Sequence, residues 1–223
     1  MADKQIPIVY TLTAKCRDCY RCLRVCPVGA IGVRDGQAFV DDARCIQCGT
    51  CIRECPQHAK TYRGDIDDVR ALLDSGARVA VSIAPSFVSI FKEWEITRLP
   101  SALWQLGFTH IGETAEGAQL VAQKSAAILN SQSCNSHCGI STSCPAVVHF
   151  IEKYHPEMTG GLTPVVSPMI AHGRMMKDKL GDDTRVVFIG PCVAKKKEAE
   201  RPEYGGVIDA VLTFEELRQW LEA

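Results

Sequence analysis

The sequence predicts two domains, a small α+β domain followed by a larger α/β domain with a largely parallel sheet. Eight of the twelve cysteines lie in two similar runs that end at residue 55. Beyond them, short apolar runs rich in β-branched residues alternate with segments of helical periodicity. That alternation is typical of parallel strands joined by crossover helices. We therefore place the small domain at residues 1–64, a linker helix at 65–77 and the α/β domain at 78–223.

The two cysteine runs are copies of one motif, C-x2-C-x2-C-x3-C-P, offset by 45 − 16 = 29 residues. This spacing is the signature of bacterial ferredoxins with two [4Fe–4S] clusters, in which the fourth cysteine of each run binds the other cluster. Three thiolates separated by two residues each can bind one cube, and the fourth cysteine of the run is placed too far from that cube to be its fourth ligand. The spacing thus assigns one cluster to Cys16, Cys19, Cys22 and Cys55, and the other to Cys45, Cys48, Cys51 and Cys26.

Two other uses of these cysteines are less consistent with the pattern. Structural zinc is usually held by separated C-x2-C pairs or by mixed Cys and His sets. A disulfide scaffold needs an oxidising compartment. The first fifteen residues lack the apolar core of a secretory signal, and no apolar run approaches the roughly 18 residues of a membrane span. We therefore expect a cytoplasmic protein with no membrane span, and its net charge of −1 gives no reason to expect nucleic-acid binding.

The secondary structure expected along the chain begins with a hairpin over residues 33–42, which turns at Asp35-Gly36. Apolar residues at helical spacing, followed by a terminal glycine, predict a helix over residues 66–76. Continuous apolar runs predict strands buried on both faces. The expected strands are 78–86, 109–113, 184–192 and 208–213, and the expected helices are 99–108, 117–130, 146–157 and 214–223.

Candidate functional residues gather where two predicted strands end, because ligand sites in such sheets lie at the carboxyl edge. One strand ends in Ala84-Pro85 and another in Gly190-Pro191-Cys192. Cys144 precedes a predicted helix, where backbone N–H groups favour a thiolate. Each of these cysteines can instead be a small buried apolar residue.

These segments resemble the iron–iron hydrogenases, whose N-terminal extension is often of the ferredoxin type. Thr142-Ser143-Cys144-Pro145 is similar to the family motif Thr-Ser-Cys-Cys-Pro, and Pro191-Cys192-x-x-Lys195-x-x-Glu198 to Met-Pro-Cys-x-x-Lys-x-x-Glu. The resemblance implies that residues 78–223 form the first half of an active-site domain. Cys144 and Cys192 would then bind a third [4Fe–4S] cluster carrying a di-iron subcluster, the H-cluster. Ala84, Pro85 and Lys195 would line that cofactor, and Ser143 and Glu198 would stand at catalytic positions.

The departures from the family favour a hydrogen-sensing or electron-transferring relative. The family's third motif, Glu-Met-x-Cys-x-x-Gly-Cys, should follow the helix at 214–223, so we expect a truncated chain, one completed by another polypeptide, or a degenerate relative. Ser143 replaces the proton-relay cysteine, and residues 118–130 offer no carboxylate. The expected partners are an electron-transfer protein and a signalling domain or completing polypeptide. The alternative is an iron–sulfur electron carrier or scaffold without hydrogenase activity.

Several other residues are expected to have structural roles. Cys134, His137 and Cys138 form a poor zinc spacing by themselves and are expected to be loop residues. His149 and His155 are expected to be surface or capping histidines. The run Lys195-Lys196-Lys197 is expected to be solvated, although it can also dock an acidic electron partner. Trp94, Trp104 and Trp220 lie in helical patterns and are expected in the core.

Overall fold

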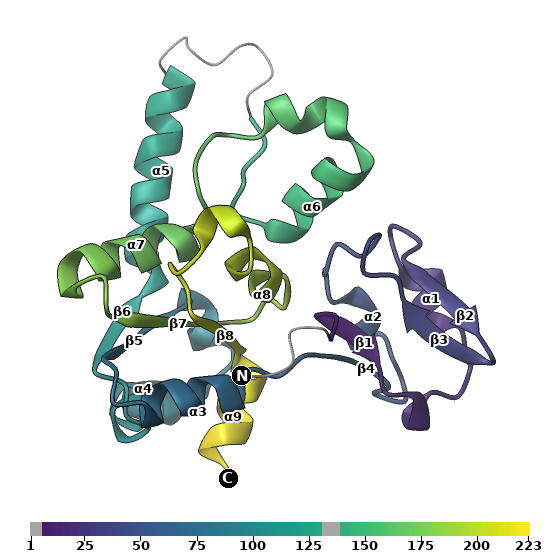
Figure 1. Ribbon diagram of the computed structural model, residues 1–223, viewed down its shortest axis with the longest axis horizontal. Coiled ribbons are helices and arrows are strands. Elements are labelled where there is room, and N and C mark those ends of the chain that lie inside the picture. The colour runs from purple at the N-terminus through teal and green to yellow at the C-terminus, as the bar shows by residue number, and fades with distance from the viewer. Residues whose placement is uncertain (1–5, 131–138) are drawn as a thin grey trace.

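The computed structural model describes residues 6–130 and 139–223, and the predicted loop residues Cys134, His137 and Cys138 lie outside them. A small N-terminal part stands beside a larger part that is built on a four-stranded sheet (Figure 1). No helix of the described residues is long and apolar enough to cross a membrane.

The small part contains two short antiparallel sheets and two short helices. Strands β1 (Val9–Thr11) and β4 (Lys60–Tyr62) pair with each other, as do β2 (Ile31–Arg34) and β3 (Gln37–Val40). The predicted hairpin is confirmed: β2 and β3 turn at Asp35 and Gly36, whose φ angles of 49° and 72° both have the sign a tight two-residue hairpin turn requires. The helices are α1 (Arg21–Val25) and α2 (Thr50–Arg53), one after the start of each cysteine run.

The larger part is an α/β domain whose sheet is parallel throughout, with strand order β6-β5-β7-β8. Its strands are β5 (Val79–Ile83), β6 (His110–Glu113), β7 (Arg185–Gly190) and β8 (Ala210–Thr213). Every residue of β5 and β8 is buried, as the apolar runs predicted, because helices cover both faces of the sheet. The coarse fold prediction is therefore confirmed.

Helices α3, α4 and α9 lie on one side of this sheet and α5, α7 and α8 on the other (Figure 1). Their bounds are α3 (Ile66–Asp74), α4 (Glu93–Gln105), α5 (Thr114–Asn130), α7 (Pro168–Leu180), α8 (Ala194–Ala199) and α9 (Phe214–Leu221). Helix α6 (Pro145–Tyr154) lies between the sheet domain and the small part. Short 3₁₀ segments occur at Thr13–Lys15, Pro85–Ser89, Pro156–Gly161 and Pro202–Tyr204.

The tryptophan prediction is wrong for two of the three residues. Trp94 and Trp104 are 57% and 54% exposed. Helix α4 buries Leu99 and Leu103, which are spaced four residues apart on one face. Trp104 lies about 100° further round the helix than Leu103, so it points toward solvent. Trp220 is partly buried and packs edge-on against Phe108 in the core.

The expectation of a solvated lysine run is also wrong. Lys196 is 1% exposed, and its ammonium group lies between Asp65, 3.0 Å away, and Glu216, 3.1 Å away. It also donates a hydrogen bond of 2.6 Å to the Val211 carbonyl. These carboxylates come from α9 and from the residue before α3, so no local pattern signals the burial. Only Lys197 of the run has a substantially exposed side chain, at 42%.

Candidate metal centres

The first candidate centre is a hollow in the small part where four thiols converge. Its lining includes three cysteines of the first run and the last cysteine of the second, which are Cys16, Cys19, Cys22 and Cys55. The last cysteine of the first run does not line it. This is the crossed arrangement that the spacing predicts for a [4Fe–4S] cube.

The second set of thiols is brought together around Cys51. Burial raises the pKa of Cys51 to about 12, and Cys45, Cys48 and Cys26 contribute in the same direction because their charges lie nearby. Burial likewise raises the pKa of Cys45, with Cys48 and Cys26 among the further causes. Cys26 therefore lies with the second run although it belongs to the first. Ligation by these eight cysteines remains a prediction, and their positions fit it.

Backbone N–H groups point at the sulfur atoms in both sets, which suits thiolates or cluster ligands. The amide of Ala30 donates to Cys26 Sγ and that of Ala59 to Cys55 Sγ, each at 3.2 Å. The two donors occupy the same position in the two repeats. Within the described residues, no three His, Cys, Asp or Glu side chains are close enough to hold a single metal ion.

The third candidate centre lies at the carboxyl edge of the large sheet, where β5 and β7 end side by side. The Ala84 amide donates to the Ile189 carbonyl at 2.8 Å, so the segment Ala84-Pro85 starts next to the end of β7. A Cβ atom added at Gly190 would lie 3.2 Å from Cβ of Ala84. The chain then continues through Pro191 into Cys192. The predicted strand-end residues are thus neighbours.

Cys144 and Cys192 approach each other at this edge. Burial is the main cause that raises the pKa of Cys192, and the nearby charge of Cys144 raises it further. Cys192 is partly buried, whereas Cys144, the residue that precedes α6, is exposed. Two thiols are therefore available for one metal group, and their role as ligands remains a prediction.

The other predicted site residues lie against this pair. Lys195 Nζ is 2.6 Å from Glu198 Oε2 and donates to the Ser143 carbonyl oxygen at 3.2 Å. The side chains of Lys195 and Glu198 are 10% and 6% exposed. Burial strengthens the attraction between the two charges, and removal of either partner would leave an unpaired buried charge that destabilises the protein. The ammonium group of Lys195 is consequently held beside the segment that carries Cys144.

A cavity between the two parts connects the second centre with the third. Its lining includes Cys48 of the small part and Cys192 of the sheet domain. Val193, next to Cys192, packs in the small part's core, and a Cβ atom at Gly49 would lie 3.6 Å from its Cγ2. Because Gly49 and Val193 follow cysteines of different centres, those centres are close neighbours across the cavity.

Helix α6 fixes this contact in a way that sequence analysis missed. Lys153 Nζ donates to the Cys45 carbonyl at 2.7 Å, and the Tyr154 hydroxyl donates to the Arg44 carbonyl at 2.8 Å. His149 is buried rather than at the surface, because this face of α6 rests on the cysteine loop. Burial and the charges of Arg201 and Lys153 lower the pKa of His149. The side chain of His155, in contrast, is 43% exposed, which agrees with a position at the surface.

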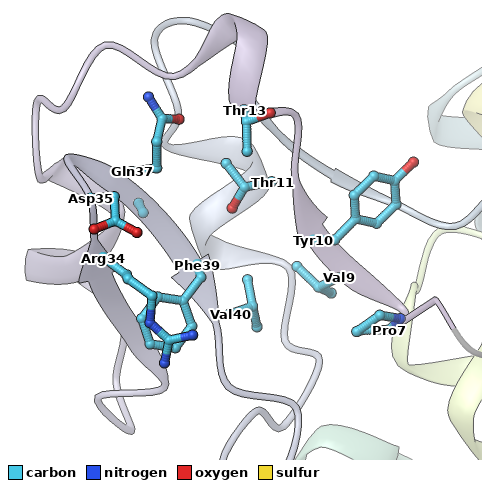
Figure 2. A pocket seen from close by; sticks show the side chains of 11 residues that line it. Pro7, Val9, Tyr10, Thr11, Thr13, Arg34, Asp35, Gln37, Phe39 and Val40 are labelled. Carbon is cyan, nitrogen blue, oxygen red and sulfur yellow. The ribbon is translucent and has the colours of Figure 1, made fainter.

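A further hollow lies between β1 and the β2–β3 hairpin (Figure 2). Thr11 and Gln37 face the hollow, and the guanidinium of Arg34 stacks 5.1 Å from the centre of the Phe39 ring at one side. No cysteine lines it. The hollow is therefore separate from the three thiol centres, although Thr11 also lines the first of them.

Family models match most of the chain. Residues 77–223 match the model "Iron only hydrogenase large subunit, C-terminal domain", and residues 8–56 match a "4Fe-4S dicluster domain". Iron hydrogenase 1 of Clostridium pasteurianum is 33% identical over 93% of this chain and 42% of its own length. The NADP-reducing hydrogenase subunit HndD of Solidesulfovibrio fructosivorans is 30% identical over 91% of this chain and 34% of its own. The cytosolic Fe–S cluster assembly factor NAR1 of Vanderwaltozyma polyspora is 32% identical over 45% of this chain and 19% of its own. The chain thus spans less than half the length of these relatives.

Proposed function

Because the chain belongs to the iron-only hydrogenase large-subunit family and carries a dicluster domain, we propose that it relays electrons between a redox protein and a hydrogenase-type centre. The observation that carries this proposal is the cavity lined by both Cys48 and Cys192. Cys48 belongs to the second thiol set and Cys192 to the third, so both sets border the same cavity. Electron transfer between clusters bound at these two centres would require no conformational change.

The first cluster site is the entry point for electrons. Cys19 and Cys48 are both exposed, but Cys48 lines the cavity that faces the sheet domain and Cys19 does not. Lys15, Arg17 and Arg24 are exposed around it, and Arg24 donates to the Cys19 carbonyl at 3.2 Å. Cationic groups around an exposed cluster favour a redox partner with an acidic surface, because opposite charges speed the encounter.

At the third centre, Cys144 and Cys192 would supply two of the thiolates that hold a cube. The group bound there in the family supplies the iron site at which hydrogen is formed or split. Lys195 contributes a fixed positive charge, since Glu198 and the Ser143 carbonyl orient its ammonium group. Charged donors make the strongest hydrogen bonds to a negative ligand in a dry site.

The residues around the third centre provide a poor route for proton transfer. Ser143 stands where the family motif has a cysteine, and a hydroxyl is a poor proton relay near neutral pH because its pKa is far above that of a thiol. Helix α5 offers no carboxylate over residues 118–130. A sensor tolerates slow proton transfer, whereas a hydrogen producer does not. We therefore assign the protein to slow redox chemistry or hydrogen sensing.

The test loads the longest natural form of the polypeptide with the di-iron unit under anaerobic conditions. Infrared bands of carbonyl and cyanide ligands should appear, and they should be lost in Cys192→Ala. Hydrogen turnover should be slow and should rise in Ser143→Cys. Fast turnover by the unchanged protein contradicts the sensory assignment.

A scaffold or electron carrier without hydrogenase activity is the second candidate. The likeness to NAR1 and the poor proton route favour it. The same infrared experiment separates the two functions: loaded cubes with no carbonyl or cyanide bands would favour the scaffold.

A further inference from the structure

The repeat reveals an unexpected charge. Since the second cysteine run lies 29 residues after the first (45 − 16 = 29), Lys60 occupies the position that Ile31 holds in the first copy. Both residues are buried, at 3% and 7% exposed. A lysine therefore stands in the core at a position where the other repeat has an aliphatic residue.

Within the described residues, the ammonium group of Lys60 bonds to neutral oxygen atoms and forms no salt bridge with a carboxylate. It donates to the Ala38 carbonyl at 3.2 Å and to the Thr11 hydroxyl. Thr11 lies on β1, and its register partner on β4 is Lys60 itself. A buried ammonium without a counter-ion is strongly disfavoured, because neutral oxygen atoms replace only part of its hydration. Negative charge must come from elsewhere.

The cysteines supply that charge. Lys60 lines the hollow of the first centre together with Cys22 and Cys55. Ala38, whose carbonyl accepts a hydrogen bond from Lys60, packs in one core cluster with Cys51. Cys22 and Cys55 belong to the first set and Cys51 to the second. Lys60 thus lies within electrostatic reach of both sets.

We propose that Lys60 is a counter-ion shared by the two [4Fe–4S] clusters and that it makes both easier to reduce. Reduction adds one negative charge to a cluster, and a nearby cation stabilises the reduced form more than the oxidised form. Cluster potentials respond to net charge and hydrogen bonding in this way. The inference rests on the presence of the two clusters and not on hydrogenase activity.

The expected size follows from the interaction of two unit charges. At a separation of about 12 Å and an effective dielectric constant of about 20, the interaction changes an equilibrium constant by about tenfold. Replacement of Lys60 by a neutral residue should therefore lower the ratio of reduced to oxidised cluster about tenfold at a fixed potential. For one electron this is a shift of about 59 mV. Both clusters should shift, because the charge reaches both.

The test is a redox titration of the full chain with both clusters loaded, followed by electron paramagnetic resonance. Lys60→Ile introduces the residue of the equivalent position, and Lys60→Arg keeps the charge. Lys15→Gln is the control, because it removes a charge from an exposed lysine beside Cys16. Iron and sulfide are counted in each variant first. Failure of the unchanged chain to load clusters would refute the iron–sulfur assignment itself.

With Lys60→Ile, both clusters should become harder to reduce. The reduction potentials of Lys60→Arg should stay near those of the unchanged protein, and those of Lys15→Gln should shift little. If Lys60→Ile does not load both clusters, Lys60→Gln provides the neutral variant for the same titration. The proposal would be overturned if Lys60→Ile changed the ratio of reduced to oxidised cluster less than twofold at a fixed potential. A change in this ratio for only one of the two clusters would also overturn it.

Discussion

The buried ion-pair network around Lys196 provides the sharpest stability prediction. Its side chain is fully buried and pairs with Asp65 and Glu216, whose side chains are 7% and 5% exposed. Lys196→Met keeps most of the volume but removes the cation from Glu216 and from the Val211 carbonyl, while Asp65 keeps its ion pair with Arg63 at 3.2 Å. Removal of one partner from a buried network costs about 3–5 kcal/mol. We expect the unfolding temperature of the sheet domain to fall by about 6–20 °C.

The matched control is Lys197→Met in the same run of lysines. Lys197 is 42% exposed and lies 3.7 Å from Glu200, so its replacement should cost less than about 1 kcal/mol. Urea unfolding of the cluster-loaded proteins, followed by circular dichroism, measures both variants. The slope of free energy against urea should not change between them. Equal midpoints for Lys196→Met and Lys197→Met would refute the argument that this network stabilises the fold.

Three further predictions follow from contacts elsewhere. Cys55→Ala should damage the cluster held by the first cysteine run, and Mössbauer spectra should show the other cluster retained; the opposite pattern would rule out the crossed ligation. Gly117→Ala should destabilise the protein by about 1–3 kcal/mol in calorimetry, because its Cβ would lie 2.7 Å from Cβ of His172, while Gly160→Ala, with open space around it, should be neutral. Burial lowers the pKa of His172 in the folded state, so on acidification the histidine is protonated first in the unfolded state. The free energy of unfolding should therefore fall as the pH drops below about 6.5. His172→Asn should make this fall smaller, and an unchanged dependence of stability on pH would contradict the argument.

The sheet could be predicted from the sequence because its strands are buried on both faces. Such strands appear as continuous apolar runs, and β5, β7 and β8 all lie within predicted segments. The grouping of the cysteines into two crossed sets could be predicted because the motif spacing is local, and ligation by them stays a prediction. Helix α7 was missed, since its sequence places His172 and Gly173 among apolar residues and shows no clear amphipathic face.

The residues that sequence analysis misjudged depend on partners far away in the chain. Lys196 is buried because Asp65 neutralises it, and His149 is buried because the loop around Ile46 covers α6. Neither relation leaves a local pattern. For Lys60 a signal did exist: comparison of the two repeats shows a lysine opposite Ile31. An internal repeat can thus identify an unusual core residue without any homologue.

Iron and acid-labile sulfide per chain, measured with Mössbauer spectroscopy after anaerobic reconstitution, test the central claim most directly. The two crossed cysteine sets predict about eight irons and eight sulfides in residues 1–64, with the spectra of [4Fe–4S] cubes. Cys144→Ala with Cys192→Ala should leave that signal unchanged, because those thiols belong to the third centre. Stoichiometric zinc, or about four irons per chain in this double variant, would contradict the account.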